Sequence, residues 1–309
     1  MKTKLYLLTG FLGSGKTTFL LNILKELKDK RIGIIQNEFG KLGIDGEILK
    51  NDDVQMVEIN RGSIFCSCLK LNFVKALAEM SENNFEYMFV ESSGLGDPSN
   101  IDEILEAVKR ISGDKYELKG AICLVDAVNF LSQIDDLETV NRQLKHCNIS
   151  IITKSDIADD ETVKAVEEKI KEINPICRIL KSINGKTDYG FMEEDLMKYK
   201  YSESEETTNT VENKPRTFFM NFDGEVERGD FEEFIKEISD DTYRIKGFFN
   251  IKNEGWKQID VVGRRMDYSE CEKKEMSQLV FISKTGTAII KRIFSAWEEN
   301  TGLEMKLKN

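Results

Sequence analysis

Two hydrophobic patterns alternate along the first half of the chain. Short, nearly continuous apolar runs lie at residues 5–8, 32–35, 87–90, 121–125 and 149–152. Between them, apolar residues recur every three or four positions at residues 17–28, 73–81, 101–109, 137–147 and 162–173. Continuous apolar strands separated by helices predict an α/β fold, a parallel sheet with helices on both faces. Residues 54–59 are a candidate for a further strand.

The second half has a different pattern. Residues 199–215 are polar and predict an exposed linker. Strands are then expected at residues 217–222, 243–251, 256–262 and 279–283, and helices at residues 231–238 and 288–300. Asn253-Glu254-Gly255 predicts the turn between the second and third of these strands. We therefore expect a parallel-sheet domain at residues 1–198 and a smaller α+β domain at residues 216–309.

The most informative motif lies between the first apolar run and the first helical pattern. Residues 10–17 read Gly-Phe-Leu-Gly-Ser-Gly-Lys-Thr, which is the G-x-x-x-x-G-K-[ST] phosphate-binding loop of P-loop NTPases. Glycines permit positive φ and close approach of backbone N–H groups to phosphate, and the helix N-terminus adds its positive dipole end. Lys16 is expected to reach the β- and γ-phosphates, and the Thr17 hydroxyl to bind Mg²⁺. The nucleotide-binding candidates in this loop are Gly13, Ser14, Gly15, Lys16, Thr17 and Thr18.

The phosphate loop alone does not choose between adenine and guanine. Thr153-Lys154-Ser155-Asp156 follows the fifth apolar run, where guanine-specific P-loop proteins carry N-K-x-D. The Asp156 carboxylate can accept hydrogen bonds from guanine N1–H and from the exocyclic amino group, a pair of donors that adenine lacks. Lys154 would lie along the base with its aliphatic stem, and the Thr153 hydroxyl can tether the loop. A polar turn at a strand end is the alternative interpretation.

Glu91 ends the third apolar run, which is the Walker B arrangement of an acidic residue at a strand end. It is a candidate to hold Mg²⁺, and Gly94 to offer a backbone N–H to the γ-phosphate. An ordinary exit from a strand is the alternative. Asp97-Pro98 predicts a helix cap with proline in the first turn rather than a metal ligand.

Two further segments carry candidate chemistry. Glu38, within Asn-Glu-Phe-Gly at residues 37–40, lies where a switch segment is expected and is a candidate to orient the attacking water or to bind metal; a solvated glutamate is the alternative.

Cys66 and Cys68 form a C-x-C pair just before a helix, whose N-terminus favours the thiolate. Structural zinc usually has four ligands, so the others would come from Glu38, a partner or a second copy of the chain. Two structural thiols are the alternative. Lys16, Glu38 and Glu91 are the catalytic candidates.

Composition removes several classes of function. The net charge is −11 and no basic cluster is present, which argues against nucleic-acid binding. No apolar run approaches the ~18 residues of a membrane span. Six cysteines in 309 residues do not make a disulfide framework, and the first apolar run leaves no room for an export signal. We therefore expect a cytoplasmic protein. Cys123 is expected in the core, and His146 is the single histidine.

These motifs together resemble the CobW-type GTPases, relatives of the urease and hydrogenase accessory GTPases UreG and HypB. In the first domain, the resemblance rests on residues 9–18, 37–40, 43–45, 91–98, 125–127 and 153–156. It continues past the linker, where residues 244–248, Trp256, Gln258 and residues 279–282 are similar to the CobW C-terminal domain. The resemblance covers nearly the whole chain.

The resemblance implies slow hydrolysis of GTP, with Mg²⁺, coupled to delivery of a metal or a metal-containing cofactor, such as a corrinoid, to a client enzyme. It also implies a C-x-C-C metal motif, usually within G-C-x-C-C. Residues 62–66 here read Gly-Ser-Ile-Phe-Cys, Lys41 replaces a common acidic residue, and there is no His-rich tail. The Cys66/Cys68 pair then binds a different metal (zinc and cobalt are candidates), binds more weakly, or is completed by the client.

Two other functions fit the same residues. One is a GTP-dependent regulator of a partner protein without metal transfer, in which the cysteines are structural. The other is a P-loop kinase of a small molecule, although the sequence shows no Arg-rich lid segment. The expected partner is a client metalloenzyme or a cofactor-dependent enzyme, and the sequence leaves open whether the chain forms a homodimer.

Overall fold

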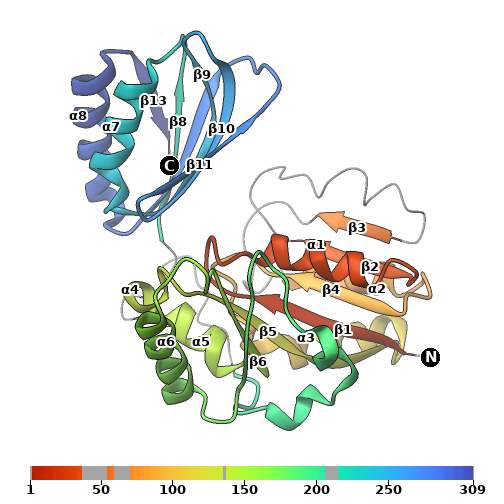
Figure 1. The fold of residues 1–309 in the computed structure, drawn as a ribbon. Coiled ribbons are helices and arrows are strands. Elements are labelled where there is room, and N and C mark those ends of the chain that lie inside the picture. The colour runs from red at the N-terminus through yellow and green to blue at the C-terminus, as the bar shows by residue number, and fades with distance from the viewer. Residues whose placement is uncertain (1, 37–53, 59–69, 135–136, 206–214, 309) are drawn as a thin grey trace. The chain divides into compact units, whose positions relative to one another are not determined.

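The computed structural model describes residues 2–36, 54–58, 70–134, 137–205 and 215–308 (Figure 1). The chain forms two compact units, Met1–Asn213 and Lys214–Asn309. None of the described helices is both long enough and apolar enough to cross a lipid bilayer.

A seven-stranded parallel sheet forms the centre of the first unit, as predicted. In spatial order its strands are β3 (Val54–Glu58), β2 (Ile32–Gln36), β4 (Tyr87–Glu91), β1 (Thr3–Thr9), β5 (Tyr116–Asp126), β6 (Ile149–Thr153) and β7 (Arg178–Lys181) (Figure 1). The helices are α1 (Lys16–Glu26), α2 (Lys70–Met80), α3 (Ile101–Ser112), α4 (Phe130–Ile134), α5 (Glu138–Lys145) and α6 (Asp160–Ile173). Every strand and helix that the hydrophobic pattern predicts in this unit is present.

Burial on both faces of this sheet explains the continuous apolar runs. Residues 5–8 of β1 are all fully buried, although successive side chains of a strand point to opposite faces. Tyr6 and Leu8 pack in one cluster with Phe19 of α1, so Leu5 and Leu7 face the other side. Such a strand requires helices on both faces of the sheet.

The carboxyl ends of the parallel strands bring polar residues to one edge of the sheet. Gln36, Glu91, Asp126 and Thr153 end β2, β4, β5 and β6, and each is 4% exposed or less. Strand pairing places Gln36 opposite Glu91 and Asp126 opposite Thr153. Open α/β sheets bind ligands outside the carboxyl ends of their strands, so this edge positions the candidate site.

Several short elements are not predicted by the hydrophobic pattern. They are α4, β7 and the 3₁₀ helices at Pro98–Asn100, Tyr189–Glu193 and Leu196–Tyr199. The four residues of β7 have a charged residue at each end, so they show no strand periodicity of their own. Elements this short are determined by the neighbours they pack against rather than by local pattern.

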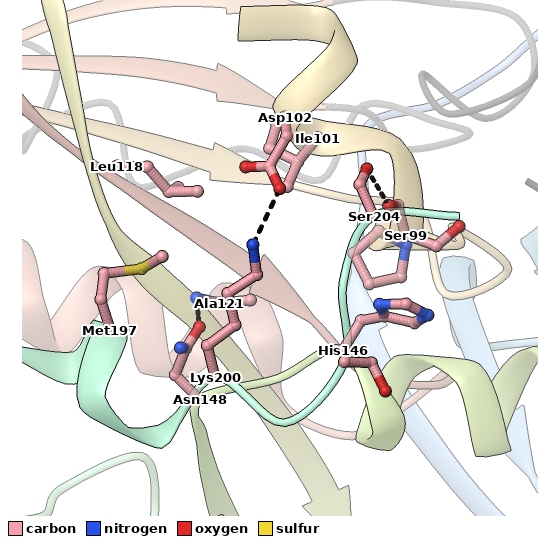
Figure 2. A pocket seen from close by; sticks show the side chains of 12 residues that line it. Ser99, Ile101, Asp102, Leu118, Ala121, His146, Asn148, Met197, Lys200 and Ser204 are labelled. Atoms are coloured by element: carbon pink, nitrogen blue, oxygen red, sulfur yellow. Dashed lines mark hydrogen bonds and ion pairs between the residues drawn. The ribbon is translucent and has the colours of Figure 1, made fainter. Parts of the chain in front are cut away.

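The first part of the predicted linker is attached to the first unit. We call residues 200–205 the strap. Lys200 Nζ lies 3.2 Å from Asp102 Oδ2 of α3, and Ser204 Oγ donates a hydrogen bond to the Ser99 carbonyl oxygen at 2.7 Å (Figure 2). The exposed connection therefore begins later than residue 199, because polar strap residues pair with the protein rather than with water alone.

The second unit is a six-stranded antiparallel sheet with two helices. In spatial order its strands are β11 (Arg265–Glu270), β10 (Gly255–Val262), β9 (Thr242–Ile251), β12 (Ser277–Ser283), β8 (Thr217–Phe222) and β13 (Met305–Lys308). The helices are α7 (Arg228–Ser239) and α8 (Ile289–Thr301). Asn253 and Gly255 take the positive φ that the turn between β9 and β10 requires. The α+β prediction is confirmed, while β11 and β13 lack a clear sequence signal.

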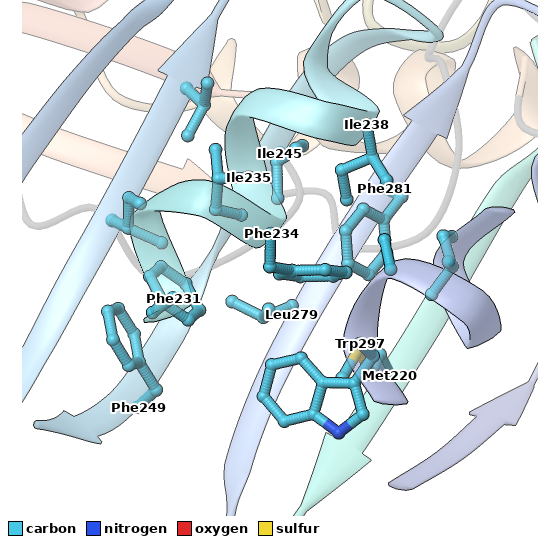
Figure 3. Packing of buried hydrophobic residues seen from close by; sticks show 14 of the residues in the cluster. Met220, Phe231, Phe234, Ile235, Ile238, Ile245, Phe249, Leu279, Phe281 and Trp297 are labelled. Carbon is cyan, nitrogen blue, oxygen red and sulfur yellow. The ribbon is translucent and has the colours of Figure 1, made fainter. Parts of the chain in front are cut away.

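Aromatic and aliphatic side chains together form the core between this sheet and its helices (Figure 3). Phe234 of α7 lies edge-on to Phe281 of β12 and to Trp297 of α8, with ring centroids 6.3 and 5.0 Å away. All three side chains are almost completely buried. Edge-to-face packing of this kind adds stability beyond the area that the rings bury.

Replacing Phe234 with alanine is expected to destabilise the second unit by about 3–5 kcal/mol, because it leaves a cavity between two aromatic rings. Chemical unfolding of the full chain followed by tryptophan fluorescence measures this unit, since both tryptophans, Trp256 and Trp297, belong to it. The control is Phe294→Ala on α8, whose side chain is 46% exposed. Equal unfolding midpoints for the two variants would contradict the assigned core.

Candidate functional site

The phosphate-loop motif forms the turn between β1 and α1. Gly10, Gly13 and Gly15 adopt positive φ values of 129°, 74° and 87°. At Gly10 there is also no space, because a Cβ would lie 2.3 Å from the Leu124 carbonyl oxygen. Lys16 is the first residue of α1, and its Nζ donates to the carbonyl oxygens of Gly10 at 2.7 Å and Phe11 at 3.0 Å. The loop thus needs glycine for both conformation and space, and it wraps around the ammonium group.

A hydroxyl and a carboxylate meet beside this loop. Thr17 Oγ1 donates to Glu91 Oε1 at 2.8 Å, and Gln36 Nε2 donates to Glu91 Oε2 at 3.0 Å. Glu91 is 2% exposed and Gln36 is 4% exposed. Gln36 fixes the carboxylate from the neighbouring strand. The hydrophobic pattern alone does not identify Gln36 as a site residue, although a polar residue at the end of an apolar strand is a signal for one.

The turn after β4 lies against the phosphate loop. Gly96 N donates to the Ser93 carbonyl oxygen at 2.8 Å, which closes the turn around Gly94. A Cβ on Gly94 would lie 2.6 Å from the backbone nitrogen of Leu12, so only glycine fits here. The fully buried Gln143 of α5 donates from Nε2 to the carbonyl oxygens of Gly96 at 2.8 Å and Gly94 at 3.3 Å. Gln143 is a second residue that sequence reasoning missed.

Asp97 caps the short helix that follows, as predicted. Its Oδ1 accepts a hydrogen bond from Ser99 N at 3.0 Å, and Pro98 occupies the first position of the 3₁₀ helix. Its Oδ2 accepts from Arg142 Nε at 2.8 Å. The Asp97 side chain is completely buried and is therefore held in place rather than presented to a ligand.

Residues 153–156 form the loop after β6. Thr153 Oγ1 donates to the carbonyl oxygen of Ser14 at 2.9 Å and so ties this loop to the phosphate loop. Lys154 has a positive φ of 57°, and its Nζ lies 2.7 Å from Asp126 Oδ2 at the end of β5. Asp156 is exposed. The structure therefore brings Thr153 and Lys154 to the same sheet edge as the phosphate loop, with the Asp156 carboxylate open to solvent.

A turn after β7 also reaches the start of α1. Asn184 and Gly185 have positive φ values of 50° and 75°, and Asn22 Nδ2 of α1 donates to the Asn184 carbonyl oxygen at 3.0 Å. A Cβ on Gly185 would lie 3.0 Å from the carbonyl oxygen of Thr18, whose side chain is exposed. The Asn-Gly dipeptide predicts a turn, but only the fold shows that it lies beside the site.

The candidate metal ligands Glu38, Cys66 and Cys68 lie outside the described residues. Within the described part of the chain, no group of three or more His, Cys, Asp or Glu side chains is placed to hold a metal ion. Cys123 is buried, as predicted. Cys147 Sγ lies 3.5 Å from Cys177 Sγ, and burial raises the pKa of Cys147 well above its usual value, which favours the neutral thiol over the metal-binding thiolate.

Replacing Gly94 with alanine is expected to weaken nucleoside triphosphate binding about five- to a hundredfold, because the new methyl group forces the turn away from Leu12 at a cost of about 1–3 kcal/mol. Isothermal titration calorimetry measures the affinity. The matched control is Gly229→Ala in the first turn of α7, where a Cβ meets no atom within 4 Å. Wild-type affinity in Gly94→Ala would show that the turn does not have to lie against the phosphate loop.

The chain is similar to several known proteins. The chain is similar to the zinc chaperone YjiA of Escherichia coli, with 29% identity over 221 residues, 69% of this chain and 66% of that protein. It is also similar to zinc-regulated GTPase metalloprotein activator 1 of Dictyostelium discoideum, with 27% identity over 223 residues, 59% of this chain and 46% of that protein. These matches span about half to two thirds of the length of the relatives.

A solved structure supports the fold. The crystal structure of the Zn(II)-bound YjiA GTPase from E. coli matches with a TM-score of 0.50 and 22% identity, covering 97% of this chain and 99% of that one. The family model for the CobW/HypB/UreG nucleotide-binding domain matches residues 4–181, and that for the cobalamin synthesis protein cobW C-terminal domain matches residues 216–297. The first of these models covers more than half of the sequence, so the chain belongs to the CobW/HypB/UreG family of P-loop GTPases.

Proposed function

We propose that this protein binds GTP with Mg²⁺ at the carboxyl edge of its parallel sheet, hydrolyses it to GDP and phosphate, and couples this cycle to delivery of a metal or a metal-containing cofactor to a client enzyme. The observation that carries the proposal is the hydrogen bond between Thr17 and Glu91 beside the phosphate loop. P-loop GTPases hold their magnesium ion with such a hydroxyl and such a carboxylate. The names of the relatives, zinc chaperone and metalloprotein activator, support the metal-delivery part.

Thr17 and Glu91 are the residues that would hold Mg²⁺. Both supply oxygen, the ligand atom that Mg²⁺ prefers, so the donor set fits the ion. The bound ion would neutralise charge on the β- and γ-phosphates. Gln36 supports this role because its hydrogen bond to Glu91 Oε2 leaves Oε1 facing Thr17.

The phosphates would occupy the phosphate loop. Lys16 lies within the loop, where its ammonium group can compensate the negative charge of the β- and γ-phosphates. Gly94 is the proposed donor of a backbone N–H to the γ-phosphate, which fits its position against Leu12. Glu38 remains the candidate to orient the attacking water, a role that rests on its position in the sequence.

The guanine base would lie at the loop after β6. The Lys154 ammonium is held by Asp126, which leaves the aliphatic stem available to pack along the base. The Asp156 carboxylate is exposed and would accept both guanine donors. The Thr153–Ser14 hydrogen bond supports this arrangement because it links base recognition to the phosphate loop.

Replacing Asp156 with asparagine is expected to lower GTP affinity by about a hundredfold, because the carboxamide keeps one acceptor oxygen but sets an N–H donor against the amino group of guanine. Xanthosine triphosphate carries a carbonyl in place of the amino group, so its affinity should rise in the same variant. Calorimetry with both nucleotides measures the exchange of preference. Asp160→Asn, at an exposed position four residues further on, is the matched control and should keep the preference for GTP. Unchanged GTP affinity in Asp156→Asn would remove this residue from base recognition.

The cargo would bind at Cys66 and Cys68. The C-x-C spacing supports a pair of thiolate ligands, and zinc and cobalt, free or within a corrinoid, are the cargo candidates. Further ligands would come from Glu38, from the client metalloenzyme or from a second copy of the chain. Nucleotide state would act on the Glu38 segment and on the Cys66/Cys68 loop. Bound γ-phosphate would order the switch segments, hydrolysis would release them, and the metal would leave when the loop relaxes.

GTP and the cargo metal are expected to change each other's affinity by the same factor, which linkage requires of coupled sites. Zn²⁺ and Co²⁺ are titrated into the reduced protein with Mg²⁺ and either GDP or a non-hydrolysable GTP analogue. The difference between the two nucleotide states should disappear in the double variant Cys66→Ser/Cys68→Ser, whereas Cys271→Ser in the second unit should retain it. Equal metal affinities in both nucleotide states of the wild type would contradict metal delivery and favour a GTP-dependent regulator.

A further inference from the structure

One guanidinium on α5 joins segments that are far apart in the sequence. Arg142 donates from Nε to Asp97 Oδ2 at 2.8 Å, from Nη2 to Ser99 Oγ at 2.8 Å and from Nη1 to Glu205 Oε2 at 3.0 Å. The Arg142 side chain is 11% exposed and that of Asp97 is fully buried, so solvent and salt screen their interaction little. The Arg142 side chain therefore contacts both the segment after Gly94 and the strap.

The neighbouring residue on α5 holds the other end of the same segment. Gln143 Nε2 contacts the carbonyl oxygens of Gly94 and Gly96 while Arg142 contacts Asp97 and Ser99. Two adjacent residues thus position the whole stretch from Gly94 to Ser99 from one rigid helix. In this position Gly94 lies against the phosphate loop, and the Arg142–Glu205 ion pair is formed at the same time.

The strap rests on the far end of this stretch. Glu205 accepts from Lys145 Nζ at 2.5 Å, and its backbone N–H donates to the Ser99 carbonyl oxygen at 3.1 Å. That carbonyl also accepts from Ser204 Oγ (Figure 2). The hydrogen bond from Lys145 lowers the pKa of Glu205 below its usual value, so the carboxylate stays charged at neutral pH. His146 Nε2 lies 3.9 Å from Glu205 Oε2.

We propose that Arg142 is a positioning residue that couples the turn at residues 94–97 to the strap, so that GTP binding and attachment of the strap strengthen each other. The inference rests on the proposed binding of GTP at the phosphate loop. A γ-phosphate that holds Gly94 against the loop also holds Asp97 and Ser99 where Arg142 and the strap meet them. Because linkage is reciprocal, the attached strap must favour GTP over GDP by the same factor by which GTP favours attachment.

This coupling gives the strap a function in the nucleotide cycle. The second unit begins nine residues after Glu205, so the strap is the last described part of the first unit before the connection. If the strap attached equally well with GTP and with GDP bound, it would stabilise the first unit without responding to the nucleotide. The two possibilities differ in whether the strap responds to the γ-phosphate.

The first test measures the ratio of affinities for a non-hydrolysable GTP analogue and for GDP, with Mg²⁺, in the full chain. Glu205→Gln removes the carboxylate charge that pairs with Arg142 and leaves the Arg142–Asp97 pair intact. The ratio of affinities is expected to fall about two- to fivefold, the range of a partly exposed ion pair. Arg142→Lys cannot reach three partners from one ammonium and should lower the ratio at least as much. The control is Glu203→Gln, whose side chain is 92% exposed and pairs with Lys200; its ratio should equal that of the wild type.

The second test measures hydrogen exchange of the strap amides in the wild type. The amide of Glu205, which bonds to Ser99, is expected to exchange several-fold more slowly with the GTP analogue than with GDP. Equal exchange in both states, with an unchanged affinity ratio in Glu205→Gln, would overturn the coupling while leaving GTP binding itself intact. Absence of guanine nucleotide binding in the wild type would overturn both the proposed function and the coupling.

Discussion

The phosphate loop is the constraint on which the site depends, because three other segments contact it directly. Gly10 packs so closely on β5 that no side chain fits, and the loop closes around the Lys16 ammonium group. Glu91 reaches Thr17 at its end, Thr153 is hydrogen-bonded to Ser14 within it, and Gly94 lies against Leu12. A phosphate that shifts this loop would therefore act on the ends of β4, β5 and β6 through direct contacts.

Two routes lead from this loop to segments that the proposed function needs to move. One passes through Glu91 and Gln36 to the end of β2, directly before the residues that carry Glu38. The other passes through Gly94 to Gln143 and Arg142 of α5, and from Arg142 to the strap. Both use hydrogen bonds from neutral or cationic side chains to fixed carboxylates or carbonyl oxygens. Small shifts at the phosphate loop can be passed on because these contacts are directional and, apart from the partly exposed Arg142–Glu205 pair, little exposed to solvent.

The sequence was sufficient for the parts of the molecule that local chemistry determines. Continuous apolar runs predicted the strands of the parallel sheet, the glycine spacing predicted the phosphate loop, and Asp97-Pro98 predicted a cap. Gln36, Gln143 and Arg142 could not be found in this way, because their importance comes from strand register and helix packing, which bring distant residues together. For the same reason, local sequence predicts an exposed linker where the strap lies: the partners of the strap, Asp102 and Ser99, lie about a hundred residues earlier.

The proposed cycle and the strap coupling both require that a guanine nucleotide binds at Lys16 and Thr17 with magnesium. Isothermal titration calorimetry on reduced, nucleotide-free wild-type protein with Mg²⁺ tests this requirement most directly, using GTP, GDP and ATP at equal concentrations. We expect heat of binding from both guanine nucleotides and at least about tenfold weaker binding of ATP, because adenine lacks the two donors that Asp156 would accept. Tight binding of ATP with no heat from GTP or GDP would contradict this expectation.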